Sequence, residues 1–227
     1  MKCPKCKTAM VFICEGINIH KYYECKNCGQ IVSVDKLVFL PIHKERAKVI
    51  SEKILNLIDL DSCFVVCIGG IAGTGKTEIA TNLVEDLKGQ YRVYPKLLSM
   101  DGFYSSLPFD RNKRRRETGI IGPEEINWIC VNNSVSNLCN SRMYNVIVLE
   151  GLYALYYNDA HLNVYIDSTI KDTEKFRHVR AKEKKSKFRE HVLKKENEAV
   201  CKTKPKAHLI FNSDNSHIWF DKPYLVR

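Results

Sequence analysis

The sequence has no apolar run long enough to cross a lipid bilayer. Its longest apolar stretch, residues 63–73 ("CFVVCIGGIAG"), is interrupted by glycines and falls well short of the roughly 20 residues that a membrane-spanning helix needs. The first ten residues, "MKCPKCKTAM", lack the apolar segment of a secretory signal. We therefore expect a cytoplasmic protein without a membrane partner.

Internal repeats and low-complexity tracts are also missing. The 227 residues, 44% hydrophobic and 27% charged, suit one α/β domain of ordinary size with a small satellite. The formal net charge of +10 favours partners that carry negative charge, such as nucleotides, phosphorylated metabolites or RNA. The charge does not choose among them, and no feature of the sequence indicates an oligomeric state.

Four of the ten cysteines form two close pairs near the start of the sequence. The spacing of "CPKC" and "CKNC" matches a tetrahedral site in which two knuckles hold one Zn²⁺. We expect residues 1–36 to form a zinc ribbon whose metal is structural, in preference to a redox dithiol. The predicted zinc ligands are Cys3, Cys6, Cys25 and Cys28.

The other cysteines are not expected to form a disulfide framework. Cys63 and Cys67 lie in an apolar, strand-like run, where a free cysteine acts as a small hydrophobic residue. The remaining four, which show no pattern, are Cys14, Cys130, Cys139 and Cys201.

Residues 37–227 form the second predicted domain. Pro41 is expected to break the extended segment after the ribbon. In residues 43–58 the apolar side chains recur at helical spacing, which predicts an amphipathic helix packed on the edge of this domain.

The strongest motif is "GIAGTGKT", a complete phosphate-binding P-loop. It follows a β-branched strand at 64–68 and opens a helix at 77–87, which is the context that the motif requires. Lys76 is expected to bridge the β- and γ-phosphates of a nucleotide, and the Thr77 hydroxyl to bind Mg²⁺. The predicted nucleotide-binding residues are Gly70, Ala72, Gly73, Thr74, Gly75, Lys76, Thr77 and Glu78.

Two further strands are expected to end in acidic residues. The strand at 146–149 is followed by Glu150, and the strand at 92–99 by Asp101. Charged groups at the carboxyl ends of parallel strands line the ligand crevice, so Glu150 is a candidate Mg²⁺ ligand. The guanine-recognition motif of GTPases is missing, which argues against that class.

The order and spacing of these motifs resemble the uridine kinase and phosphoribulokinase family. The resemblance rests on the P-loop, "SMDGFY", "GPEEIN" and "VIVLEGLYAL", and covers roughly residues 62–212. It implies an ATP- and Mg²⁺-dependent kinase with a parallel sheet that has helices on both faces. It further implies that Asp101 activates the acceptor hydroxyl and that Glu150 assists Mg²⁺. It also implies that arginines of a lid segment, Arg177 and Arg180, close over the phosphates.

The acceptor side is less defined. Phe103 and Tyr104 are expected to wall the acceptor pocket, although an Asp-Gly turn followed by core aromatics is the alternative interpretation. "GPEEIN" differs from the "HPDAFD"-like patch of uridine kinases and is nearer to the "GPEA" of phosphoribulokinases, which puts uridine in doubt as the acceptor. The basic run at 110–118 has three interpretations: a clamp for an acceptor that already carries phosphate, an RNA contact, or an exposed loop. Arg111 and Arg115 are its candidate substrate-binding residues.

The predicted function is therefore phosphoryl transfer from ATP to a hydroxyl of a small molecule: a nucleoside, sugar or sugar phosphate. The alternative is an RNA-associated nucleotide-binding protein, or an RNA kinase, that uses the ribbon and the basic run. A nucleic-acid partner is open but not favoured. The acceptor and the purpose of the ribbon do not follow from the sequence.

Overall fold

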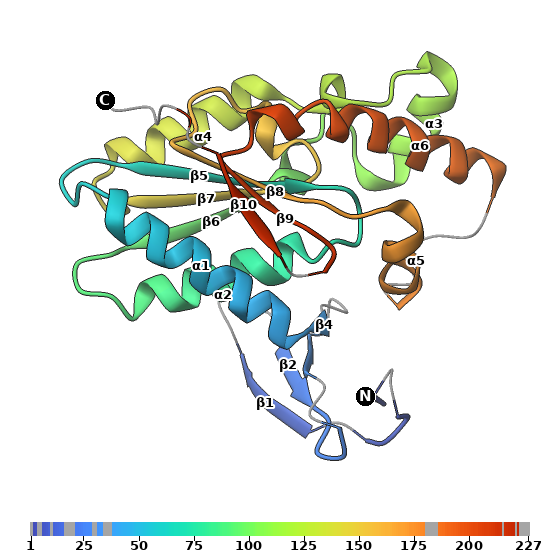
Figure 1. Cartoon of the computed structure of the whole chain (residues 1–227). Helices are drawn as coiled ribbons and strands as arrows, with labels where there is room; N and C mark the ends of the chain where they lie inside the picture. Colours follow the sequence, from blue (N-terminus) through green and yellow to red (C-terminus); the bar gives the residue numbers. More distant parts are fainter. Residues whose placement is uncertain are drawn as a thin grey trace.

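The chain forms one small and one large β-sheet, with the helices gathered around the large one (Figure 1). The structure is a computed structural model that describes residues 2–3, 6–9, 11–15, 21–28, 31–33, 38–179, 186–214, 216–220 and 222. No helix among these residues is both long and apolar enough to cross a membrane.

The small sheet is antiparallel, with its strands in chain order. Its strands are β1 (Val11–Glu15), β2 (Lys21–Glu24), β3 (Ile31–Ser33) and β4 (Val38–Phe39). β4 pairs with β3 through Val38 and Phe39, so the small sheet continues past residue 36, where the sequence places the end of the first domain.

The large sheet has six strands in the order β10-β9-β8-β5-β7-β6. Five are parallel, and β10 is antiparallel to β9 at one edge. The strands are β5 (Phe64–Gly70), β6 (Pro95–Ser99), β7 (Val146–Glu150), β8 (Leu162–Ile166), β9 (Leu209–Phe211) and β10 (His217–Trp219). Every residue of β5 and β7 is buried, as expected for strands covered on both faces. The predicted α/β fold class is confirmed.

Helices cover both faces of this sheet (Figure 1): α1 and α2 on one, α4 and α6 on the other. Alternate residues of each strand therefore enter different cores, so that Val66 packs with α1 and α2, whereas Val65 packs with α4 and α6. The helices are α1 (Pro41–Leu57), α2 (Lys76–Lys88), α3 (Pro108–Thr118), α4 (Trp128–Asn140), α5 (Ile170–Val179) and α6 (Lys187–Cys201). Short 3₁₀ turns include η2 (Met100–Phe103) and η3 (Pro123–Glu125).

Two helices differ from the sequence-based expectation for local reasons. The basic run is no loop, because Pro108 opens α3 and Gly119, in a left-handed conformation with φ 68°, ends it. α1 begins at Pro41, which stands in the first turn, where the missing N–H of proline costs no hydrogen bond. Pro41 thus opens a helix as well as ending an extended segment.

One disulfide joins the start of β5 to the end of α4, between Cys63 and Cys139. The expectation that Cys63 is a free hydrophobic residue is therefore wrong. The two cysteines are 76 residues apart, and nothing in the sequence places α4 beside β5. Cys67 is a buried free thiol, as expected.

Candidate active site

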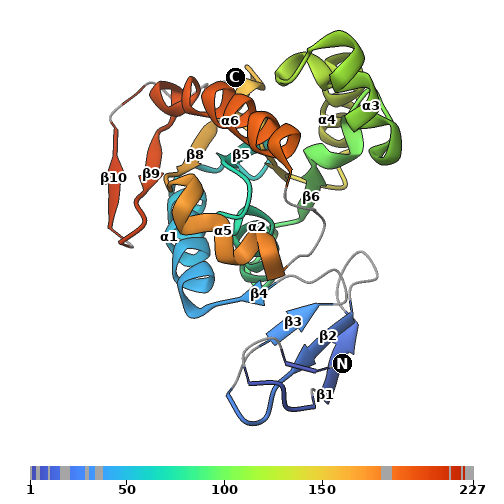
Figure 2. The ribbon, with the colours of Figure 1, turned by 90° about the vertical axis from the view of Figure 1, so that its right-hand side faces the viewer.

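The parallel register of three strands brings the predicted functional residues to one edge of the large sheet. Glu150, the last residue of β7, pairs with Ile68 of β5 on one side and with Ser99 of β6 on the other. The P-loop follows β5, and Asp101 follows β6 within η2. Figure 2 looks onto this edge, with α5 and α6 to one side and α3 to the other.

The P-loop is held in a conformation that requires glycine. Gly73 and Gly75 have φ values of 86° and 83°, which side chains rarely tolerate. A Cβ on Gly75 would lie 2.4 Å from Nε2 of His43, and a Cβ on Gly73 would lie 3.0 Å from Cγ of Arg177. The loop is therefore enclosed by α1 and α5, which supply these two contacts.

Lys76 and Thr77 stand at the start of α2. Lys76 is buried, and its Nζ donates to the carbonyl oxygen of Ile71 at 2.7 Å. The Thr77 hydroxyl donates to Oε2 of Glu150 at 3.1 Å. This hydroxyl and carboxylate are adjacent hard oxygen ligands, the kind that Mg²⁺ takes alongside nucleotide phosphates, so the donor set fits that ion.

Glu150 is 3% exposed. Burial raises the pKa of its carboxyl group, while hydrogen bonds from Ser99 and Thr77 and the charge of Lys76 act in the opposite direction. A cation bound beside this carboxylate would favour its ionised form.

Asp101 is exposed and lines a cavity of about 780 Å³ together with Lys76, Thr77 and Glu150. Its position depends on Gly151, which has φ 150°. A Cβ on Gly151 would lie 2.5 Å from Cβ of Met100. Glycine after Glu150 thus lets the end of β7 approach the turn that carries Asp101.

The two predicted aromatic residues have different surroundings. Tyr104 lines the cavity, and burial raises the pKa of its hydroxyl, with the charges of Glu196 and Asp101 adding to the effect. Phe103 packs against the core that contains α4 and does not line the cavity.

Arg115 is buried in a network of charges. Its Nε and Nη2 donate to the two carboxylate oxygens of Glu125 at 2.7 and 2.8 Å, and Nη2 also donates to Glu196 at 2.9 Å. Burial by itself lowers the pKa of Arg115, but the hydrogen bonds to Glu125 and the charges of both glutamates raise it overall. The network ties α3 to η3 and α6.

The predicted lid is described in part. Arg177 of α5 lines the cavity, and its Nη1 donates to the carbonyl oxygen of Ile170 at 2.9 Å and to the Thr173 hydroxyl. Arg180 lies outside the described residues.

A second cavity, of about 480 Å³, lies against the other side of the P-loop. Gly73, Thr74, Gly75 and Glu78 line it, with further residues from α1 and the end of β8. Among the remaining predicted nucleotide-binding residues, Ala72 lines the larger cavity, and Gly70 packs against Ile166 of β8.

Comparison with known proteins agrees with this architecture. No family model matches the chain. The uridine kinase of Saccharomyces cerevisiae is 27% identical over 136 residues, which are 47% of this chain and 26% of the yeast protein. The match therefore spans about a quarter of that relative. The larger domain is thus similar to a P-loop kinase in sequence over part of its length.

One solved structure shares the fold of the larger domain. D-glycerate 3-kinase from Cryptococcus neoformans var. grubii superimposes with a TM-score of 0.52 at 12% identity, covering 78% of this chain and 97% of that one. A possible uridine kinase from Bacillus stearothermophilus gives a TM-score of 0.47 at 16% identity, covering 74% and 98%.

Several residues of the cavity of about 780 Å³ are not predicted from the sequence. "GPEEIN" is a recognisable motif, but it assigns no role to Glu125. Nothing in the sequence connects Glu196 with Arg115, because they are 81 residues apart. The other unpredicted residues that line the cavity include Asn112, Phe188 and Arg189, whereas Arg116 belongs to the basic run that the sequence offers as a clamp for a phosphorylated acceptor.

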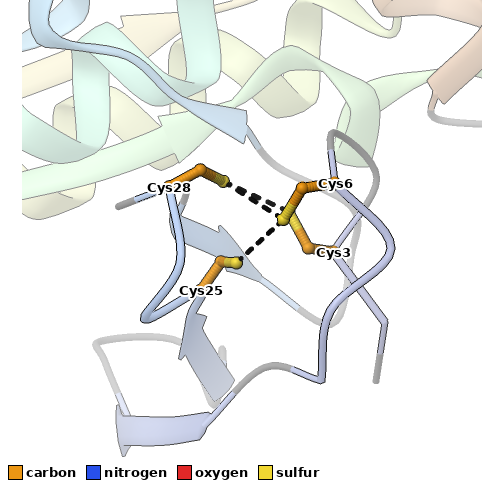
Figure 3. Close-up of side chains that lie close together, drawn as sticks. All are labelled: Cys3, Cys6, Cys25 and Cys28. Carbon is orange, nitrogen blue, oxygen red and sulfur yellow. Dashed lines mark hydrogen bonds between the residues drawn. The ribbon is translucent and has the colours of Figure 1, made fainter.

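The four predicted zinc ligands lie together in the small domain (Figure 3). Sγ of Cys6 is 3.3 Å from that of Cys25 and 3.6 Å from that of Cys28, and the Cys3 and Cys28 sulfurs are 3.6 Å apart. Four sulfurs at Zn–S distances of ~2.3 Å stand about 3.8 Å apart in a tetrahedron, so the cluster fits zinc. Hydrogen bonding with Thr8, and to a lesser extent with Asn27, lowers the pKa of Cys6 to about 5, which favours the thiolate that a metal binds.

Loss of Arg115 should destabilise the larger domain. Arg115→Met leaves Glu125 and Glu196 buried without their main partner, and we expect the free energy of unfolding to fall by about 3–5 kcal/mol. Urea unfolding followed by circular dichroism measures this change. The matched control is Arg114→Met on the same helix, expected within about 0.5 kcal/mol of the wild type; equal stabilities for the two variants would contradict a structural role for Arg115.

Proposed function

We propose that the protein is a kinase that transfers the γ-phosphoryl group of ATP to a hydroxyl group of a small molecule. The observation that carries this proposal is the convergence of Lys76, Thr77, Glu150 and Asp101 on one cavity. Phosphoryl transfer depends on positioning and on charge stabilisation, and these four side chains supply a cation, a metal-binding pair and a base. The names of the related proteins, uridine kinase and D-glycerate 3-kinase, support an alcohol acceptor.

In this proposal the P-loop holds the triphosphate. Backbone N–H groups of the loop and of the first turn of α2 bind phosphate oxygens, helped by the dipole of this helix. Lys76 exchanges its bond to the carbonyl of Ile71 for one to phosphate. The cavity of about 480 Å³ beside Thr74, Gly75 and Glu78 would accept the rest of the nucleotide.

Thr77 and Glu150 would hold Mg²⁺. When bound, the ion neutralises charge that develops on the phosphate oxygens. The hydrogen bond between the Thr77 hydroxyl and the Glu150 carboxylate keeps both oxygens in the cavity and close together.

Asp101 acts as the base. Its exposed carboxylate hydrogen-bonds the acceptor hydroxyl, orients it and takes its proton as the oxygen forms its bond to phosphorus. The bond between that phosphorus and ADP breaks, and ADP leaves. Tyr104 forms part of the wall of the acceptor pocket, while Arg177 lies at the phosphates and excludes water.

The small domain holds one structural Zn²⁺ in this proposal. The buried sulfurs of Cys3 and Cys25 and the half-buried ones of Cys6 and Cys28 form a closed set of four ligands. A closed set leaves no position for a reactant, so the metal stabilises the ribbon and takes no part in phosphoryl transfer.

Asp101→Asn should abolish catalysis and spare nucleotide binding. The amide cannot accept the proton, and we expect kcat to fall at least about 100-fold with the Kd for ATP unchanged. Coupled detection of ADP across alcohol acceptors measures the first quantity, and calorimetric titration with ATP measures the second. The matched control is Asp110→Asn, which changes an exposed carboxylate on α3. This variant should retain full activity. Undiminished turnover by Asp101→Asn would show that the base has been misassigned.

Removal of one cysteine ligand should release zinc without stopping phosphoryl transfer. Elemental analysis of the purified protein is expected to give one zinc per chain, and markedly less for Cys6→Ser, whose thermal unfolding should begin at a lower temperature. Cys130→Ser changes an exposed free cysteine away from the cluster and should keep the metal. A wild-type protein that contains no zinc after growth in zinc-supplemented medium would rule out the metal site.

A further inference from the structure

The larger cavity has a basic side that the residues for phosphoryl transfer do not explain. α3 contributes Arg111, Asn112 and Arg116 to it, and α6 contributes Phe188 and Arg189. Because Asp101 lines the same cavity, these side chains surround the space for the acceptor. Given the proposed kinase function, on which this inference rests, their chemistry selects the class of acceptor.

Two arginines of this side are already neutralised. Arg115 is hydrogen-bonded to Glu125 and Glu196, and Nη1 of Arg189 lies 3.5 Å from Oε2 of Glu196. Two guanidinium groups and two carboxylates balance in charge. This network fixes α3 against α6 and adds no net attraction for an anion.

Arg111 and Arg116 are held in another way, by stacking on aromatic rings. Cζ of Arg111 lies 3.4 Å from the ring centroid of Tyr104, and Cζ of Arg116 lies 4.4 Å from that of Phe188. Neither guanidinium forms an ion pair or hydrogen bond with any residue that the structure describes. Nε of Arg111 is buried and has no hydrogen-bond partner there.

Stacking prepares these two groups to bind an anion. Stacking fixes the plane of the guanidinium and leaves the N–H groups at its edge available. These N–H groups can form two parallel hydrogen bonds to the oxygens of a phosphate. Two unpaired guanidinium groups carry a charge of +2. A phosphomonoester carries about −1.5 to −2 at pH 7, so it matches this charge more closely than a carboxylate does.

We propose that the acceptor is itself a small phosphomonoester with a free hydroxyl group. Arg111 and Arg116 hold its phosphate, and Asp101 receives the proton of its hydroxyl as the new phosphorus–oxygen bond forms and ADP departs. The product carries two phosphate groups. Arg111 and Tyr104 are half-buried, whereas Arg116 is exposed. A small ligand can reach both arginines in the cavity, while a nucleic-acid backbone along the surface would reach Arg116 more readily than Arg111.

Matched pairs of acceptors test this proposal. ADP release is measured with ribose and ribose 5-phosphate, glycerol and glycerol 3-phosphate, and uridine and uridine 5′-monophosphate, with glycerate as the carboxylate and a 5′-hydroxyl RNA oligonucleotide as the polymer. We expect kcat/KM to be at least about 10-fold higher for a phosphorylated member than for its parent. Arg111→Gln and Arg116→Gln should each raise the KM for the phosphorylated acceptor about 10- to 100-fold, with the KM for ATP unchanged.

Two further variants sharpen the test. Arg114→Gln removes the same charge from the same helix, but Arg114 does not line the cavity. The KM of this variant for the phosphorylated acceptor should therefore equal that of the wild type. Arg111→Lys keeps the charge but loses the bidentate hydrogen bonding of the guanidinium. Its KM for the phosphorylated acceptor should lie between those of the wild type and Arg111→Gln. Circular dichroism confirms that each variant is folded.

A binding measurement tests the phosphate clamp separately from the kinase function on which this proposal rests. Calorimetric titration of the whole chain with ribose 5-phosphate should give a Kd that the double variant Arg111→Gln/Arg116→Gln weakens at least about 100-fold. If that loss occurs but no acceptor is phosphorylated, the clamp is supported and the kinase function fails. An unchanged Kd, or a preference for the parent alcohols, glycerate or RNA, would overturn the clamp whether or not the protein is a kinase.

Discussion

The site depends on the parallel pairing of β7 between β5 and β6. This register places Glu150 opposite Ile68, just before the P-loop, on one side and opposite Ser99, the last residue of β6, on the other. A shift of one residue would turn the Glu150 side chain to the opposite face of the sheet. Because every residue of β5 and β7 is buried, packing on both faces fixes the register, and the fold holds the phosphate loop, the metal-binding pair and the base together.

On the acceptor side of the cavity, helices α3 and α6 position the side chains, and buried ion pairs constrain how these helices pack. α3 and α6 meet through the buried network of Arg115, Glu125 and Glu196. Burying these charges is costly unless each has partners, so Arg115 stays paired with the two glutamates even though it lines the same cavity as Arg111 and Arg116. Of the four arginines of α3, Arg115 is thus structural, and Arg111 and Arg116 stack on aromatic rings.

The residues of the site that follow the strands can be predicted from the sequence, because each lies close in the sequence to the strand that positions it. The P-loop, and the acidic residues that follow two strands, each lie within a few residues of the element that positions them, and the α/β fold follows from the same patterns. The glycine at position 151 is explained only by the contact of its backbone with Met100, which joins two strands that lie far apart in the sequence.

The helical part could not be predicted in the same way. Arg111, Arg115 and Arg116 are equivalent in the sequence, and their different surroundings come from Tyr104, Glu196 and Phe188, the last two contributed by a helix far along the chain. The bond between Cys63 and Cys139 has the same origin, since it depends on how α4 packs beside β5. Long-range packing decides these pairs, and no local pattern encodes it.

The phosphorylation of a phosphomonoester acceptor is tested most directly by ³¹P NMR of the reaction between ATP and a phosphorylated alcohol. We expect a new phosphomonoester signal that grows with the ADP signals, while the original phosphate of the acceptor persists, so that the product carries two phosphates. Release of inorganic phosphate alone, with the acceptor signal unchanged, would contradict it.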